Sequence, residues 1–361
     1  SDTFLAREAR EAREPRSLPP VDSTASVMAT VATLGLAVVI LVGSERLRDF
    51  DPALVGYAIG TLVLAFGLAY RLVVWVKNPP TRRSLIRGGK ALWSCLSLRD
   101  FGRSAALVPR TAASNLVFQT FIRRRSTGRW LAHQGLFWGV ILAAAMTFPL
   151  TFGWIRFGPI QGAGSGYAIY FLGVKAASFD AWTPVGWMIF HTLDFAAVAV
   201  IGGAGYFLWR RLTDRGVRST QHFGRDLLPL LCLLLISVTG LLLTASSAFL
   251  GGRGYHFLAL VHMATVVPTL VFIPFGKFFH PFQRVAGVGV ELSRKAPLQD
   301  GGAFACRRCG DPVETAGFVE NLRQTITDLG LGYPAWVETC PRCKRIERGI
   351  AYRMGVKEGF R

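Results

Sequence analysis

Six long apolar stretches constrain this chain more than any other feature of its sequence. A transmembrane helix needs about 20 consecutive apolar residues, each adding about 1.5 Å of rise. The stretches that meet this requirement are 25–43, 53–76, 130–152, 185–209, 227–249 and 255–278. Only 17% of the residues are charged, whereas an ordinary soluble domain contains about 25%. The sequence therefore predicts an all-α integral membrane protein with a bundle of six transmembrane helices.

Positive charge is distributed unevenly between these stretches. Twelve Lys and Arg residues lie in 77–129 and five in 210–226, whereas 44–52, 153–184 and 250–254 hold two, two and one. Because basic loops near helix ends stay in the cytoplasm, we expect both termini there, in the inner membrane of a bacterium or archaeon. The net charge of +19 then reflects topology and attraction to anionic lipid or an acidic partner, rather than nucleic-acid binding.

The spans divide the chain into five predicted parts. Residues 1–24 form a cytoplasmic N-terminal arm, and 25–76 contain two transmembrane helices. Residues 77–129 form a basic cytoplasmic loop, 130–280 form a four-helix core, and 281–361 form a small charged cytoplasmic domain. In the aromatic, glycine-rich segment between the third and fourth spans, we expect a short helix lying on the membrane surface.

His133, His191 and His262 fall within the spans and His280 follows the last span by two residues, whereas His256 lies at an outer helix mouth and His222 in a cytoplasmic loop. Ionisable residues within a membrane are costly and often functional. In the predicted topology, His133 and His280 lie near the cytoplasmic surface, and His191 and His262 lie near the outer surface. His262 and His280 are 18 residues apart. On one continuous helix this spacing is five turns, or about 27 Å, so both side chains would leave the same face.

Histidines at matched depth on neighbouring helices can bind a haem iron at both axial positions. The pairs His133 with His280 and His191 with His262 therefore predict two b-type haems. No Cys-x-x-Cys-His motif is present, which argues against covalently attached haem. Glycines on the same spans could make room for a macrocycle, but close helix packing is the simpler interpretation.

Two other classes of protein are alternatives to a cytochrome. One is a transporter or metal-sensing protein whose histidines bind ions directly and whose cysteines bind zinc. A transport path would more often add Asp, Glu or Met to the spans, which contain few of them. The other is a membrane scaffold without cofactors.

The segment HFLALVHMATVVPTLVFIPFGKFFHPF resembles the last haem-binding helix of the respiratory nitrate reductase gamma-subunit family. That family includes the membrane subunits of sulfite-reductase-associated and heterodisulfide-reductase-type complexes. The preceding FGRDLLPLLCLLLISVTGLLL resembles the helix before it, and the resemblance covers about 130–285. It implies a di-haem cytochrome b that transfers electrons between menaquinone or ubiquinone and a cytoplasmic iron–sulfur or molybdenum partner subunit.

One departure from the family concerns the outer haem. In the nitrate reductase gamma subunit, the first haem-binding helix supplies two histidines, whereas the corresponding span here has only His133, so the remaining ligand must be His191. The resemblance also implies a quinone pocket beside one haem. Near the outer haem the polar candidates are Asp194, Arg253, Tyr255 and His256. Asp194 could accept a quinol proton or orient His191 through a hydrogen bond.

Four of the six cysteines lie in the C-terminal domain, as CRRC (Cys306 and Cys309) and CPRC (Cys340 and Cys343). Two Cys-x-x-Cys pairs predict a tetrahedral thiolate metal site, and disulfides are rare in the cytoplasm. The pairs resemble rubredoxin and zinc-ribbon knuckles, although Lys344 stands where the second knuckle usually has Gly. Residues 313–329 between the pairs have helical apolar spacing, unlike a rubredoxin. Zinc is the simpler expectation, and a mononuclear iron or iron–sulfur site is the alternative.

Overall fold

The computed structural model describes residues 21–46, 54–96, 106–160, 162, 164–218, 221–295, 302–331 and 334–357. Most of the predicted N-terminal arm, up to residue 20, and residues 97–105 of the basic loop lie outside these ranges. Within them, six helices are long and apolar enough to cross a membrane, which confirms the predicted number of spans and indicates a multi-pass membrane protein. These helices are α2 Ser23–Gly43, α3 Val55–Lys77, α8 Thr127–Thr151, α10 Thr192–Thr213, α12 Leu228–Phe249 and α13 Tyr255–Phe272.

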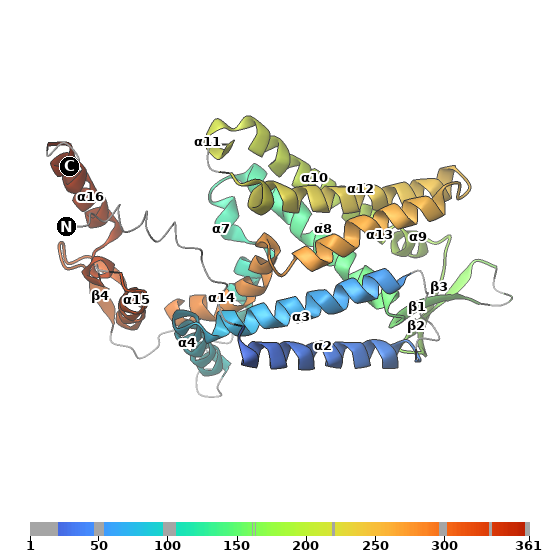
Figure 1. Cartoon of the computed structure of the whole chain (residues 1–361), viewed down its shortest axis with the longest axis horizontal. Coiled ribbons are helices and arrows are strands. Elements are labelled where there is room, and N and C mark those ends of the chain that lie inside the picture. The colour runs from blue at the N-terminus through green and yellow to red at the C-terminus, as the bar shows by residue number, and fades with distance from the viewer. Residues whose placement is uncertain are drawn as a thin grey trace.

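The six long helices form one bundle in which each packs against the next, in the order α8, α10, α12, α13, α3, α2 (Figure 1). Glycines allow α8 and α10 to approach closely. A Cβ on Gly203 would lie 2.4 Å from the carbonyl oxygen of Ala132, and one on Gly139 would lie 2.8 Å from that of Ala196. These two glycines therefore serve helix packing, the simpler of the two interpretations of their sequence positions.

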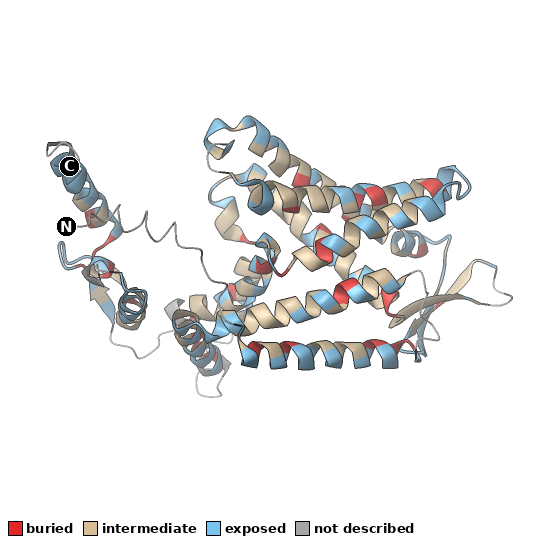
Figure 2. Cartoon of the chain, viewed as in Figure 1, coloured by how far each residue is buried: buried red, intermediate tan, exposed pale blue. Residues whose placement is uncertain are grey.

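The outer faces of the long helices are apolar and exposed (Figure 2). Val31, Val198 and Leu260 are 65%, 61% and 61% exposed. Small residues such as Ala25 and Ala204 are fully buried instead. Apolar surfaces outside and small residues between helices are what a lipid environment favours, because lipid tails solvate large apolar side chains and small ones let backbones approach.

One end of the bundle carries a three-stranded antiparallel sheet, where a short surface helix was expected. Strands β1 Ile155–Pro159, β2 Gly166–Phe171 and β3 Val174–Asp180 pair in the order β1-β2-β3. Leu172 and Gly173, both with positive φ, turn the chain between β2 and β3, as a tight hairpin requires. The expected helix in 153–184 is therefore wrong. A short helix, α9 Pro184–Phe190, follows the sheet, and we call this end of the bundle the sheet end.

Short helices build the opposite end, which we call the α14 end (Figure 1). They are α4 Pro79–Leu96, α6 Leu107–Ala112, the π-helix η2 Ala113–Val117, α7 Thr120–Arg123, α11 Arg215–Arg218, the π-helix η3 Phe223–Leu227, the 3₁₀-helix η4 Lys277–Phe279 and α14 His280–Lys295. Helices α4 and α14 cross closely, since a Cβ on Gly88 would lie 2.7 Å from the carbonyl carbon of Gly289. The described part of the predicted basic loop is therefore largely helical.

The C-terminal segment forms a small α/β unit. It consists of β4 Ala303–Ala305, β5 Pro312–Thr315, α15 Ala316–Asp328, the 3₁₀-helix η5 Pro334–Glu338 and α16 Pro341–Lys357. Helix α15 confirms the helix predicted from the apolar spacing of 313–329. Arg83 of α4 holds this unit, donating to Asp328 at 2.7 Å and to the side-chain oxygen of Asn321 at 3.1 Å. The unit is thereby attached to the α14 end of the bundle.

Candidate functional site

The segment between His262 and His280 is not one continuous helix, which corrects the geometry predicted for it. Helix α13 ends at Phe272, just before Pro274, and α14 begins at His280. Proline has no N–H to continue the intrahelical hydrogen bonds, so a helix often ends near such a position. The prediction that both histidines leave the same face after five regular turns is therefore wrong. They still lie toward opposite ends of the bundle, because His262 follows the start of α13 by about two turns.

Arg71 of α3 contacts the backbone of this interruption. Its guanidinium donates to the carbonyl oxygens of Pro274 and Gly276, the latter at 3.3 Å. It also lies 4.2 Å from the ring centre of Phe279, a side chain that is only 2% exposed. Arg71 is not among the residues predicted from the sequence, although an arginine inside an apolar stretch is a recognisable signal of a functional or structural site.

His133 and His280 are brought together at the α14 end. The Nδ1 of His280 donates to the carbonyl oxygen of Lys277 at 2.5 Å, which leaves its Nε2 for another partner. His133 lies in the second turn of α8, in the neighbourhood of His280 and Arg284. The Nδ1 of His133 is buried and has no hydrogen-bond partner among the described residues. A buried polar atom without a partner is unusual and points to a missing ligand.

His191 lies between α9 and α10, at the sheet end. Its Nδ1 is 2.7 Å from one carboxylate oxygen of Asp194, and the other oxygen accepts a hydrogen bond from Thr244 of α12, also at 2.7 Å. The ring of Trp187 lies against the imidazole, with 4.7 Å between ring centres. Orientation of His191, one of the two roles considered for Asp194, matches this geometry, and the other role depends on the cavity described below.

His262 is oriented by Thr239 of α12. The Nδ1 of His262 is 2.8 Å from the Thr239 hydroxyl, and that hydroxyl is 2.7 Å from the carbonyl oxygen of Leu235. Because the carbonyl can only accept, Thr239 donates to Leu235 and accepts from His262. The Nε2 of His262 is therefore left for another partner, as it is in His280.

A cavity of about 400 Å³ lies between α8, α10, α12 and α13, and His262, Asp194 and Tyr255 contribute to its lining. Two of the four predicted quinone residues therefore share a cavity with a predicted haem ligand. Among the described residues, Arg253 and His256 do not line this cavity, and neither does His191.

Three of the four predicted haem ligands share one hydrogen-bond pattern. The Nδ1 of His191, His262 and His280 is held by a carboxylate, a hydroxyl and a backbone carbonyl, respectively. Metal-binding histidines almost always have such a partner on the nitrogen that does not bind the metal. These three residues therefore fit metal ligation. The structure brings His133 near His280, whereas His191 lies outside the cavity that His262 lines.

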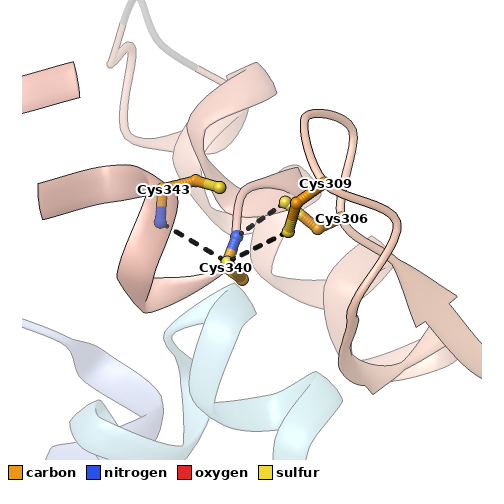
Figure 3. A group of neighbouring side chains, drawn as sticks. All are labelled: Cys306, Cys309, Cys340 and Cys343. Carbon is orange, nitrogen blue, oxygen red and sulfur yellow. Dashed lines mark hydrogen bonds between the residues drawn. The ribbon is translucent and has the colours of Figure 1, made fainter. Parts of the chain in front are cut away.

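The four cysteines of the C-terminal unit form one cluster (Figure 3). All four sulfur atoms lie within 4.8 Å of one another, and those of Cys309 and Cys340 are 3.7 Å apart. Four sulfurs bound at about 2.3 Å to a tetrahedral metal ion would be about 3.8 Å apart. The cluster therefore fits the predicted four-cysteine metal site.

Two different local structures position the cysteine pairs. The first pair lies in the turn between β4 and β5, where Gly310 has a φ of 76° and its N–H donates to the Cys306 carbonyl at 2.9 Å. The second pair lies at the start of α16. Lys344 occupies the position of the usual knuckle glycine because the chain continues there as a helix, which does not need a positive φ.

Hydrogen bonds also set the protonation of the cluster. The backbone N–H groups of Cys340 and then Cys309 lower the pKa of Cys306 to about 6. The N–H of Asp311 lowers the pKa of Cys309, but burial and hydrogen bonds with neighbouring side chains outweigh it and raise that pKa to about 12. Burial raises the pKa of the Cys343 thiol. A metal cation bound by thiolates would displace the remaining protons, so binding would release them.

Comparisons of this chain with protein-family models, curated proteins and solved structures find no match. The resemblance to the nitrate reductase gamma-subunit family therefore stays a prediction, and so does the function that it implies. The structure itself establishes six helices of membrane-spanning length and a cysteine cluster that could bind a metal.

Proposed function

We propose that this chain is a di-haem membrane cytochrome b that carries electrons between a membrane quinone and a soluble partner protein. The hydrogen-bond pattern of His191, His262 and His280 carries this proposal. A partner on Nδ1 fixes both the tautomer and the orientation of an imidazole, and it leaves Nε2 to bind a metal.

Each histidine has a role set by its place in the bundle. His133 and His280 hold one haem at the α14 end, and His191 and His262 hold the other toward the sheet end. A metal would give the imidazole of His133 a partner, since its buried Nδ1 has none among the described residues. Bound haem supplies one-electron chemistry, and the chain positions it and sets its surroundings.

The 400 Å³ cavity beside His262 is the proposed quinone site. Its volume lies within the range of about 300–1,000 Å³ found for small-molecule pockets. Oxidation of a quinol to a quinone releases two electrons and two protons. Asp194 lines the cavity and can accept a proton, with Thr244 and His191 as its hydrogen-bond neighbours. Menaquinone and ubiquinone both suit this chemistry.

The α14 end is the proposed cytoplasmic side, because the arginine-rich segments belong to it. The four-cysteine unit lies at the same end and is the proposed docking point for an iron–sulfur or molybdenum subunit. Zinc would give this unit a structural metal, whereas iron would extend the path of the electrons.

A dithionite-reduced minus oxidised absorption spectrum of the detergent-purified chain, with haem quantified per polypeptide, tests the proposal. We expect two b-type haems in the unaltered protein and one after either His280→Ala or His262→Ala. His222→Ala is the matched control, because His222 is an exposed histidine outside the long helices, and this variant retains both haems.

The absence of haem from a well-folded preparation would contradict the proposal and favour direct ion binding by the histidines. A single haem that is lost in His280→Ala but not in His262→Ala would restrict the cytochrome to the His133–His280 site. Metal analysis of the same sample identifies zinc or iron at the cysteines, and Cys340→Ser should remove that metal without reducing the haem content.

A further inference from the structure

A second cavity, of about 570 Å³, lies at the α14 end and belongs to neither the histidine sites nor the cysteine cluster. Helices α6, α7 and α14 and the π-helix η2 form its walls. Its polar lining includes Arg110, Thr111, Ser114, Asn115, Arg124 and Glu291. A pocket of this size with convergent polar groups is large enough for a small ligand.

Thr111 is the strongest indication that this cavity holds a ligand. The residue is only 1% exposed and lines the cavity, yet its hydroxyl has no hydrogen-bond partner among the described residues. Ser114 and Asn115 donate to the backbone carbonyl of Thr111, at 3.1 and 3.0 Å, which fixes them beside it. Leaving a buried hydroxyl unpaired is destabilising, so a ligand that bonds to it would remove a penalty.

The charges of the lining indicate an anionic ligand. Arg110 and Arg124 are both exposed on the cavity wall, and within the described ranges no carboxylate forms an ion pair with either guanidinium. Arginine presents parallel N–H groups that match the oxygens of a phosphate. Glu291 is the single acidic residue of the lining, and a carboxylate can accept hydrogen bonds from hydroxyl groups.

We infer that this cavity binds the headgroup of an anionic phosphoglycerolipid. Arg110, Arg124 and the Thr111 hydroxyl bind the phosphate, and Glu291 accepts from the glycerol hydroxyls. Leu107 and Phe121 give the cavity an apolar side, which suits the glycerol backbone of a lipid. Basic pockets between membrane helices near the surface are a known setting for anionic headgroups.

Native mass spectrometry of the full detergent-purified chain, titrated with phosphatidylglycerol or phosphatidylcholine, tests this inference. We expect one tightly retained phosphatidylglycerol, and about tenfold weaker retention in Arg110→Gln/Arg124→Gln. The matched control is Arg123→Gln/Arg125→Gln, which removes the same charge from the same segment outside the cavity lining. Its affinity should change by less than about threefold, because charges outside the cavity are screened by solvent.

Thr111→Val separates ligand binding from packing, because it keeps the shape of the side chain and removes the unpaired hydroxyl. We expect about tenfold weaker retention of phosphatidylglycerol, with a melting temperature at least as high as that of the unaltered chain. An unchanged lipid affinity in this variant, equal losses in both arginine variants, or no preference for phosphatidylglycerol over phosphatidylcholine would overturn the inference. Displacement of the lipid by dilute glycerol 3-phosphate would overturn the lipid assignment in favour of a soluble phosphate ester.

Discussion

At the scale of single residues, Thr239 controls the properties of His262 from the neighbouring helix. Its hydroxyl donates to the carbonyl of Leu235, so its lone pair is directed to the His262 Nδ1–H. An imidazole N–H that donates a hydrogen bond makes the opposite ring nitrogen more basic. A more basic axial ligand stabilises the oxidised state of an iron. Thr239 should therefore tune a metal that it does not touch.

If the two proposed haems are bound, replacing Thr239 by Val should raise the midpoint potential of the one held by His262 and leave that of the other unchanged. Spectroelectrochemical titration of the purified chain measures both potentials in one experiment. Thr269→Val is the matched control, because Thr269 is similarly buried on α13 but donates only to the backbone carbonyl of Thr265. A shift of the same size in both variants would show that the effect comes from packing and not from His262.

The histidines and cysteines can be predicted from the sequence as metal ligands, but the side chains that orient them cannot. Cys306 and Cys309 are predictable because a metal-binding pair is a local pattern. The contact of Thr239 with His262 joins residues 23 positions apart, and that of Arg71 with Gly276 joins residues 205 positions apart. Such pairs depend on which helices are neighbours, and apolar stretches alone do not specify that order.

At the scale of secondary structure, the interruption between α13 and α14 determines where His280 lies. The residues between α13 and α14 have backbone carbonyls outside a regular helix, and unpaired carbonyls are costly in a membrane. Arg71 satisfies two of them and stacks on Phe279, next to His280. One side chain of α3 therefore stabilises the interruption and the position of the first residue of α14.

Replacing Arg71 by Gln should destabilise the chain by about 2 kcal/mol, because charged hydrogen bonds to two carbonyls are lost. If the proposed haems are bound, it should also alter the spectrum of the one at the α14 end more than that of the other. Arg71→Lys should recover only part of the stability, since an ammonium group has neither the planar fork nor the stacking surface of a guanidinium. Thermal unfolding measures the stability, with the exposed Arg82→Gln as control. Equal losses in the Arg71→Gln and Arg82→Gln variants would contradict this role.

The ion pair between Asp22, just before α2, and Lys77, the last residue of α3, should make the stability of the chain depend on pH. A hydrogen bond from the Lys77 side chain, and then one from the Ala25 N–H, hold the pKa of Asp22 below its ordinary value of 3.8. Because the pKa is lower in the folded state, the stabilisation is present at neutral pH and is lost as the pH falls through the folded pKa. Asp22→Asn keeps a good N-cap but loses the ion pair, so its melting temperature should be a few degrees lower at pH 7. That deficit should shrink as the pH falls below about 4, and a deficit independent of pH would contradict the assignment.

The two errors at this scale have identifiable physical causes. The alternation of residues in GYAIYF, followed by the Leu172–Gly173 turn, is a strand pattern. The expectation of a helix rests on the composition of the segment and not on this alternation. The α13–α14 interruption was overlooked because an 18-residue spacing fits a continuous helix so well. Pro274 is the signal of the interruption in the sequence, since proline lacks the N–H that would continue the helix.

At the scale of the whole molecule, the cysteine unit is attached to the bundle through a small polar interface. Arg83 of α4 donates to Asn321 and Asp328 of α15, and Asn321 donates to Ser84 at 3.3 Å. The ion pair of Arg83 with Asp328 joins residues 245 positions apart, so no local pattern could predict it. An interface held by a few polar contacts orients the unit and permits it to detach and redock.

Replacing Arg83 by Gln should therefore release the cysteine unit without unfolding it. Hydrogen–deuterium exchange should become faster in α15 and in the facing turns of α4, whereas exchange around the metal-loaded cysteines and in the long helices should not change. Arg82→Gln removes the same charge from the adjacent exposed position and should leave all of these rates unaltered. If the unit transfers electrons, its release should also slow reduction of a soluble acceptor while both haems remain bound. Faster exchange throughout the unit, including the cysteine turns, would instead mean that Arg83 is needed for the unit to fold.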